Sequence, residues 1–271
     1  MPRIIVLGAG RVAAQLVPAL VRAGHQVPYV WSRTLPSAIA LATQVVGTQA
    51  GTSLDLQVLP AADVYLIAVP DAAVPEVLAT ARFPANALVA HMAGALPLAV
   101  FTPYTAVRGG VFYPLQTFSP GRSVDWQATP LCIEAADSVG EAVLIDLAYS
   151  LSRQVERVAT PQRQALHIAA VFACNFPNHL LGISHALLTE AALPVTLLEP
   201  LVRETIDKAL SNPPFTVQTG PAARGDEPTL GTHQAALIAR PDWLQVYKVL
   251  TDSIKTQMAR TPENNQGPLQ L

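Results

Sequence analysis

Residues 3–13 read RIIVLGAGRVA, an apolar run typical of a buried strand followed at once by a glycine-rich turn. Gly8 permits the tight turn, Gly10 lets backbone N–H groups approach a phosphate, and Ala13 keeps the next helix close to the sheet. A helix-type run and a second apolar stretch at residues 26–31 complete the unit. This context predicts a dinucleotide site on the helix N-terminus rather than a purely structural turn. The predicted diphosphate contacts are Gly8, Ala9, Gly10, Arg11 and Val12.

The residues after this second stretch indicate which nucleotide is bound. An NAD site carries Asp or Glu roughly 20 residues past the glycines, where the carboxylate holds the ribose hydroxyls. Here Ser32, Arg33 and Thr34 occupy that place, and Asp55 is the first acidic residue of the chain. A guanidinium can grip a 2′-phosphate with two parallel hydrogen bonds. The sequence therefore favours NADP over NAD, with a solvated Arg33 as the alternative.

The composition favours small-molecule chemistry. The 271 residues carry a formal net charge of −2, and both signs are scattered, so neither nucleic acid nor a membrane surface is an expected partner. Charged residues make up 13% of the chain and hydrophobic ones 51%, against about 25% charged in typical soluble domains. We therefore expect another subunit to cover part of the surface, most simply in a homodimer.

Neither the cysteines nor the apolar runs indicate a secreted, metal-binding or membrane protein. Cys132 and Cys174 provide no disulfide framework and no metal-ligand spacing. The first predicted strand begins at Arg3, which leaves no room for a signal peptide, and polar residues or proline interrupt the apolar runs. These features predict a cytoplasmic protein.

The order of the predicted elements divides the chain into two domains. Strands and helices alternate to about residue 158, the pattern of an α/β, doubly wound parallel Rossmann sheet of about seven strands. From Pro161 onward only helical periodicity remains, with a long helix to about residue 190 that is kinked at Pro177. We predict a Rossmann NADP-binding domain at residues 1–158, an all-α substrate and dimerisation domain at 159–260, and a polar tail at 261–271. The other predicted helices cover 37–46, 74–80, 139–152, 195–210, 229–239 and 242–259, and residues 218–226 are predicted as a loop.

Four short segments carry a family resemblance. They are HMAG at 91–94, YPLQTF at 113–118, His167 with the pair at 175–176, and GPAARGD at 220–226. With the domain order, they resemble one branch of the superfamily of 6-phosphogluconate dehydrogenase, β-hydroxyacid dehydrogenases and pyrroline-5-carboxylate reductase. Members of this branch join a Rossmann-like domain to a helical domain of unknown function, and are usually labelled NADP- or deazaflavin-dependent oxidoreductases on the strength of their fold.

The chain departs from the superfamily at one catalytic position. β-Hydroxyacid dehydrogenases carry a catalytic lysine one helical turn before an asparagine; if Asn175 matches that asparagine, Val171 occupies the lysine position. His167, two turns before Asn175, is the nearest titratable side chain. We therefore predict His167 as the acid/base and Asn175 as the amide that orients the substrate, with a buried structural histidine as the alternative.

Further candidates lie at strand ends and in the last glycine-rich loop. Val69, Pro70 and Asp71 follow one predicted strand and are expected beside the cofactor, because the nicotinamide lies beyond the carboxyl ends of parallel strands. His91 and Gly94 follow the next strand and are expected near the substrate, although a histidine there is as often structural. Predicted substrate contacts also include Tyr113 and Gln116.

The loop at 220–226 offers a substrate anchor. Arg224 has the planar cation that suits a carboxylate, and Asp226 follows it closely. The local alternative is that Asp226 caps the next helix and pairs with Arg224. Taken together, the sequence predicts an NADP-dependent oxidoreductase acting on a small carbonyl, hydroxy acid or imine, without a metal. An NADP-binding regulatory protein without turnover and a deazaflavin-dependent enzyme are the alternatives.

Overall fold

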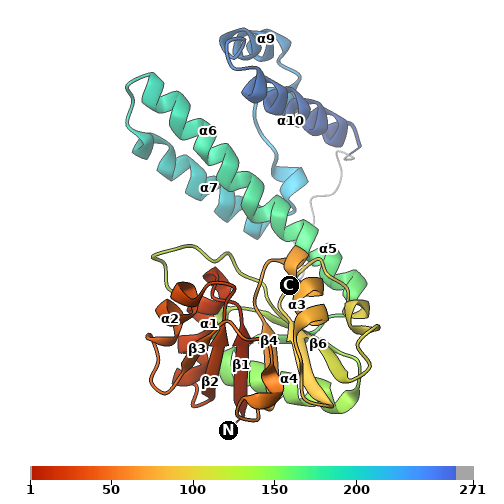
Figure 1. Ribbon diagram of the computed structural model, residues 1–271. Helices are drawn as coiled ribbons and strands as arrows, with labels where there is room; N and C mark the ends of the chain where they lie inside the picture. Colours follow the sequence, from red (N-terminus) through yellow and green to blue (C-terminus); the bar gives the residue numbers. More distant parts are fainter. Residues whose placement is uncertain (1, 261–271) are drawn as a thin grey trace. The chain divides into compact units, whose positions relative to one another are not determined.

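The computed structural model describes residues 2–260 and divides into two compact units, the first ending at Phe176 and the second beginning at Pro177 (Figure 1). The first unit is built on one sheet of eight strands in the order β3-β2-β1-β4-β5-β6-β7-β8. The strands are β1 (Arg3–Leu7), β2 (Gln26–Trp31), β3 (Gln49–Gly51), β4 (Val64–Ile67), β5 (Ala87–His91), β6 (Val107–Pro114), β7 (Leu131–Ala135) and β8 (Val155–Arg157).

The sheet is parallel except at one pair. Strand β7 runs antiparallel to β6, with Tyr113 opposite Cys132, and β8 is parallel to β7. The predicted doubly wound parallel sheet is therefore present with one antiparallel pair, where no crossover helix separates the two strands. The sequence pattern also missed β3, an edge strand of three residues that is too short for a periodicity.

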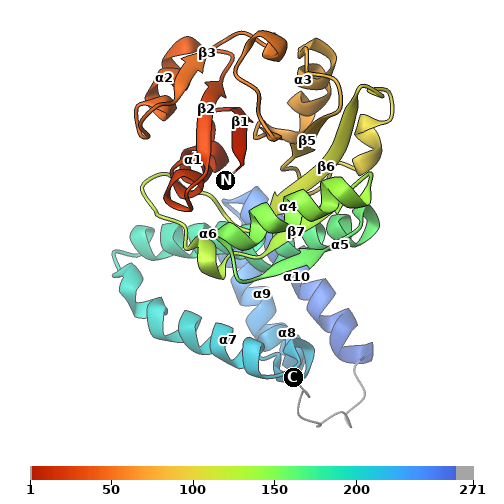
Figure 2. The ribbon, with the colours of Figure 1, turned by 90° about the horizontal axis from the view of Figure 1, so that it is seen from below.

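Helices cover both faces of the sheet, which explains why its central strands are apolar throughout. In β1, Ile4 and Val6 pack with α1 and α4, whereas Ile5 and Leu7 face the core below α3. Figure 2 shows α1 and α4 on one side of these strands and α3 on the other. The helices are α1 (Arg11–Arg22), α2 (Leu35–Ala42), α3 (Val74–Thr80), α4 (Ser138–Leu151) and α5 (Thr160–Ala170), with short 3-10 turns η1 (Leu56–Val58), η2 (Asp71–Ala73), η3 (Leu98–Phe101) and η4 (Trp126–Ala128).

The predicted long helix exists but contains an irregular turn. It runs from Thr160 to Glu190 as α5, a π-helical turn η5 (Val171–Asn175) and α6 (Phe176–Glu190). Pro177 has no N–H to donate to the carbonyl four residues earlier, and the π turn lies directly before it. Because α5 packs in the first unit, that unit extends past the predicted boundary at residue 158 and ends at Phe176.

This helix is also the one described element that is long and apolar enough to cross a membrane, by length and composition alone. Its mean hydropathy reaches 1.3 over an 18-residue window, although polar residues and Pro177 interrupt the apolar run as expected. Helices inside soluble proteins pass the same test, so the observation is weak evidence for a membrane.

The second unit is helical throughout its described residues. After α6 it contains η6 (Val195–Leu198), α7 (Glu199–Ser211), η7 (Pro214–Val217), α8 (Pro221–Arg224), α9 (Glu227–Ala236) and α10 (Pro241–Arg260). The segment predicted as a loop at 218–226 therefore includes one helical turn, α8, flanked by Gly220 and Gly225 at positive φ. The predicted polar tail at 261–271 lies outside the described residues.

Candidate functional site

A cavity of about 300 Å³ lies at the carboxyl ends of β1, β2 and β4. Seven of the predicted cofactor residues line it: Gly8, Ala9, Gly10, Ser32, Arg33, Val69 and Pro70. The residues Arg11, Val12, Thr34 and Asp71 do not line it in the described structure. The sequence did not predict Trp31, Ser37, Leu54, Ala68, Ala73, Glu76, Val77 and Thr80. Four of these share one side of η2 and α3, at residues 73, 76, 77 and 80, a helical spacing that was visible in the sequence.

The two glycines of the turn have different physical requirements. Gly8 has φ +134°, and a Cβ there would lie 2.2 Å from the carbonyl oxygen of Ala68, so only glycine lets the turn pass this close to β4. Gly10 is the N-cap of α1, and a Cβ there would meet nothing within 4 Å. No side chain caps the N-terminus of α1, and its first turn has no acidic residue. The turn therefore fits a diphosphate bound by backbone N–H groups on the helix N-terminus.

The end of β2 offers cationic and hydroxyl groups to this cavity. Arg33 is exposed and forms no ion pair among residues 2–260. Thr34 Oγ1 donates a hydrogen bond to Ser37 Oγ in the first turn of α2, at 2.7 Å. Among the lining residues the acidic side chain is Glu76, which belongs to α3 and not to the end of β2. The position at which an NAD site carries its carboxylate is thus occupied here by Ser32 and Arg33.

A second group of candidate residues gathers around the segment after β5. Gly94 is buried, and a Cβ there would lie 2.5 Å from Nδ1 of His167 and 2.9 Å from Cζ of Tyr113. Tyr113, at the end of β6, shares a hydrogen bond of 3.1 Å between its hydroxyl and Nδ1 of His167. Burial raises the pKa of Tyr113 to about 12, with smaller contributions from Cys132 and Asp71. The phenol is therefore neutral at physiological pH and can act as a hydrogen-bond partner for the imidazole.

His91 occupies a different environment from His167. Its side chain is fully buried, stacks on Phe101 with ring centroids 5.8 Å apart, and accepts a hydrogen bond from Ala93 N at 3.2 Å on Nδ1. Burial, and secondarily the Arg163 cation, lowers the pKa of His91 to about 4. Its Nε2 has no hydrogen-bond partner of good geometry in the described residues, although the Pro97 carbonyl lies close enough to raise the pKa somewhat. The ring is therefore neutral and buried, and its role near a substrate stays a prediction.

The remaining predicted contacts are dispersed. Asn175 and Gln116 are exposed, and Gln116 Oε1 accepts from Thr117 N at 2.8 Å. Asn175 lies in the π turn, so the helical spacing from which it was expected to share a face with His167 does not apply across that turn.

In the second unit, Asp226 is the N-cap of α9, and its carboxylate accepts from Thr229 N at 3.2 Å and Thr229 Oγ1 at 2.8 Å. These bonds lower its pKa. Asp226 therefore has the capping role that formed the local alternative. Arg224 is exposed and makes no ion pair with Asp226 in the described structure, so its guanidinium is available to a ligand.

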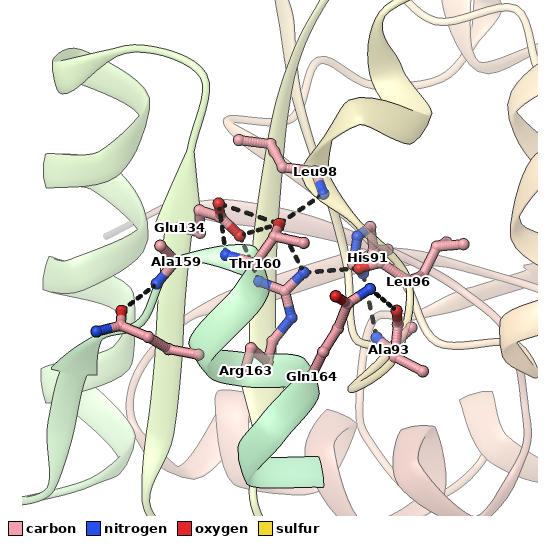
Figure 3. Close-up of polar contacts among 11 residues, drawn as sticks. His91, Ala93, Leu96, Leu98, Glu134, Ala159, Thr160, Arg163 and Gln164 are labelled. Carbon is pink, nitrogen blue, oxygen red and sulfur yellow. Dashed lines mark hydrogen bonds and ion pairs between the residues drawn. The ribbon is translucent and has the colours of Figure 1, made fainter. Parts of the chain in front are cut away.

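Sequence reasoning missed a buried ion pair close to this group of residues. Arg163 on α5 is fully buried and pairs with Glu134 on β7 (Figure 3). Glu134 is a charged residue inside an apolar strand, a pattern that marks a buried polar contact. Arg163 lies between Gln162 and Gln164 in a polar first turn, so the sequence does not mark its burial or its partner. Among residues 2–260 no cluster of three or more metal-ligating side chains occurs.

Two family descriptions match separate parts of the chain. "NADP oxidoreductase coenzyme F420-dependent" matches residues 3–94, and "Domain of unknown function (DUF2520)" matches residues 129–254. A protein of Bacteroides fragilis described as "putative NADP oxidoreductase BF3122" is 37% identical, with coverage of 94% of this chain and 98% of that one and a TM-score of 0.84. The chain belongs to the NADP oxidoreductase family that carries a DUF2520 domain.

More distant structures share the fold of this NADP oxidoreductase family. TM1727 from Thermotoga maritima is 20% identical with a TM-score of 0.67, over 95% of this chain and 98% of that one. A 1-pyrroline-5-carboxylate reductase from Streptococcus pyogenes is 13% identical with a TM-score of 0.58, over 94% and 98%. No curated protein matches the chain. The glycine turn and Gly94 fall in the first family match, whereas Glu134, Arg163 and His167 fall in the DUF2520 match.

Proposed function

We propose that this protein is an NADP-dependent oxidoreductase that transfers a hydride between nicotinamide and a small carbonyl, hydroxy acid or imine. The observation that supports this most strongly is the open glycine turn at Gly10 in the same cavity as Arg33. When bound, NADPH would supply the hydride, or NADP+ would accept it, and the protein would supply binding, orientation and electrostatics.

Each part of the chain has a defined task in this proposal. The N–H groups at the start of α1 hold the diphosphate, and Arg33 with Ser32 and Ser37 binds the 2′-phosphate. His167 exchanges a proton with the substrate oxygen or nitrogen. Nδ1 of His167 shares its hydrogen bond with the Tyr113 hydroxyl, which leaves Nε2 to face the substrate. In the imidazolium form Nδ1–H donates to the Tyr113 oxygen, and Nε2 can give its proton to a carbonyl or imine and leave a neutral imidazole.

Substrate recognition is assigned to two further side chains. In the first unit, the exposed Asn175 amide orients a carbonyl or hydroxyl. In the second unit, the Arg224 guanidinium, which makes no ion pair among residues 2–260, binds a carboxylate. A carboxylate-bearing substrate is therefore the class we expect.

Two other functions have specific observations in their favour. Val171 at the position where β-hydroxyacid dehydrogenases carry a lysine favours an NADP-binding regulator without turnover. The family description that matches residues 3–94 names coenzyme F420, a deazaflavin, which favours an enzyme using that cofactor.

One experiment separates these functions. NADPH, NADH and a deazaflavin are titrated against the protein by fluorescence, and the NADPH complex is then mixed with panels of keto acids, aldehydes and cyclic imines while absorbance follows NADPH oxidation. The proposal expects preferential NADPH binding and oxidation with at least one keto acid or imine. Binding without oxidation across the panels supports the regulator, and preferential deazaflavin binding supports the third function.

A further inference from the structure

We propose that the buried Arg163–Glu134 pair is a positioning device, which holds the segment that carries Gly94 and the helix that carries His167 in one fixed arrangement. The inference rests on the proposed function, because it assigns a purpose to the placement of His167. Arg163 and Glu134 themselves are positioning residues and touch neither cofactor nor substrate in this proposal.

The pair is embedded where three segments meet. Arg163 side-chain exposure is 0% and that of Glu134 is 17%, and Nη1 of Arg163 donates to Oε2 of Glu134. Glu134 Oε1 also accepts from Thr160 N at 2.9 Å, so the carboxylate sits on the N-terminus of α5. Negative charge is favoured at that end of a helix. Strand β7 therefore fixes where α5 begins.

The same first turn of α5 holds the segment after β5. Arg163 Nη2 donates to the carbonyl of Leu96 at 2.6 Å, and Gln164 Nε2 donates to the carbonyl of Ala95 at 2.9 Å. Leu98 N donates to Thr160 Oγ1 at 3.1 Å. Figure 3 shows these bonds converging on the segment that follows His91 from one turn of helix. The carbonyl groups of Ala95 and Leu96 and the N–H group of Leu98 thus have their hydrogen-bond partners on α5.

These bonds also set the position of His167, which lies four residues, about one helical turn, after Arg163 on α5. With the segment and the helix joined, the imidazole rests against Gly94, where even one methyl group would come within 2.5 Å of Nδ1. The Tyr113 hydroxyl completes the contact at 3.1 Å. A small displacement of α5 relative to this segment would separate the imidazole from the phenol.

Stability alone does not account for this arrangement. A buried ion pair is often no more stabilising than well-packed apolar residues, because both charges lose their hydration. Arg163 Nε also lacks a hydrogen-bond partner among the described residues. The planar fork of arginine can bond a carboxylate and a carbonyl at once, whereas a lysine ammonium is a point charge that cannot reproduce that geometry. Arg163 therefore fixes the Glu134 carboxylate and the Leu96 carbonyl relative to one another.

The test observes His167 directly and needs no substrate. Nitrogen-15 NMR of the imidazole reports the Nδ1–H to Nε2–H tautomer ratio, which the Tyr113 bond sets. The full-length variants are Glu134→Gln, which keeps shape but removes charge, Arg163→Lys, which keeps charge but removes the fork, and Gln164→Ala on the partly exposed side. Glu141→Gln is the matched control, since Glu141 pairs with Arg157 at the surface at 2.9 Å. NADPH affinity is measured on each variant.

We expect Glu134→Gln and Arg163→Lys to shift the tautomer ratio of His167 by about threefold or more, with a smaller shift for Gln164→Ala and none for Glu141→Gln. NADPH affinity should stay within about twofold, because the glycine turn is untouched. An unchanged ratio in Glu134→Gln and Gln164→Ala overturns the proposal, even if Arg163→Lys fails to fold. A wild-type chain that does not bind NADPH contradicts the proposed function instead, and the NMR result still decides the positioning role.

Discussion

Nδ1 of His167 lies 3.1 Å from the phenolic oxygen of Tyr113, although 54 residues separate the two in the chain. Tyr113 comes from the end of β6 and His167 from α5, and Gly94 provides the space between them. The pair joins a residue expected to bind substrate with one expected to carry a proton.

Replacing Tyr113 by Phe should lower turnover about fivefold, since it removes one hydrogen bond worth about 1 kcal/mol while keeping the ring. His167→Gln should lower turnover by about 10² to 10⁴, the contribution of a general acid/base. NADPH affinity should not change in either variant. Steady-state kinetics on the substrate found in the panel, with NADPH titration alongside, provide the measurement; equal turnover in wild type and His167→Gln would remove His167 from the mechanism.

The two glycines of the turn should respond oppositely to alanine. Gly10→Ala adds a methyl group to open space at φ −82°, so thermal stability should stay constant or rise by up to about 1 kcal/mol. NADPH affinity should fall about tenfold or more, because the methyl group occupies the space of the diphosphate. Gly8→Ala should destabilise the fold itself by about 1–3 kcal/mol. Calorimetric melting and NADPH titration test both; unchanged NADPH affinity in Gly10→Ala would place the cofactor elsewhere.

Cofactor preference should depend on Arg33. We expect NADPH to bind at least about tenfold more tightly than NADH, a difference of about 1.4 kcal/mol. Arg33→Ala should remove most of this preference by weakening NADPH and not NADH, because only the 2′-phosphate loses a charged partner. Arg22→Ala, at the exposed far end of α1, is the control. Isothermal titration calorimetry decides the matter, and equal affinities in the unmodified protein would contradict the NADP assignment.

His91 predicts a pH dependence of stability. Its pKa is about 4 in the folded protein against 6.5 ordinarily, so between these values the unfolded chain binds a proton that the folded chain does not. Stability therefore falls as the pH drops from about 6.5 towards 4, by about 3 kcal/mol in total, and is fully present above this window. His91→Gln, which retains an acceptor for Ala93 N, should lack this component. Urea unfolding at a series of pH values measures the difference; parallel curves for the two proteins would exclude His91 as the source.

The second unit should provide a subunit interface. Its helices expose large apolar side chains, among them Leu197, Leu201, Leu210 and Phe215 at 59–77%, and a stable dimer buries about 1,600 Å² in total. We expect a homodimer at micromolar concentration, and a charge at Leu201 (Leu201→Glu) should yield monomers. Val58→Glu, at a 76% exposed position in the first unit, should leave the mass unchanged. Light scattering gives the masses, and a monomeric wild type would be inconsistent with this expectation.

The sequence by itself determined the segments that we predict to bind the nucleotide. The strand, the glycine turn, the helix and Arg33 are neighbours along the chain, and backbone sterics and hydrophobic periodicity act over such short distances. The predicted Rossmann sheet, the helical second part and seven lining residues of the cavity followed from them. Four of the eight missed lining residues lie on η2 and α3, where helical spacing places them but no single residue type marks them.

Only the tertiary structure decided the surroundings of His91, His167 and the Arg163–Glu134 pair. The antiparallel placement of β7 brings Glu134 to the start of α5, and this long-range pairing has no signature in either segment alone. The same packing fully buries His91 and leaves His167 beside Tyr113, although the sequence presents both as single histidines in apolar surroundings. The physical reason is that burial, hydration and the choice of hydrogen-bond partner depend on which segments meet in space, and periodicity along one segment does not contain that information.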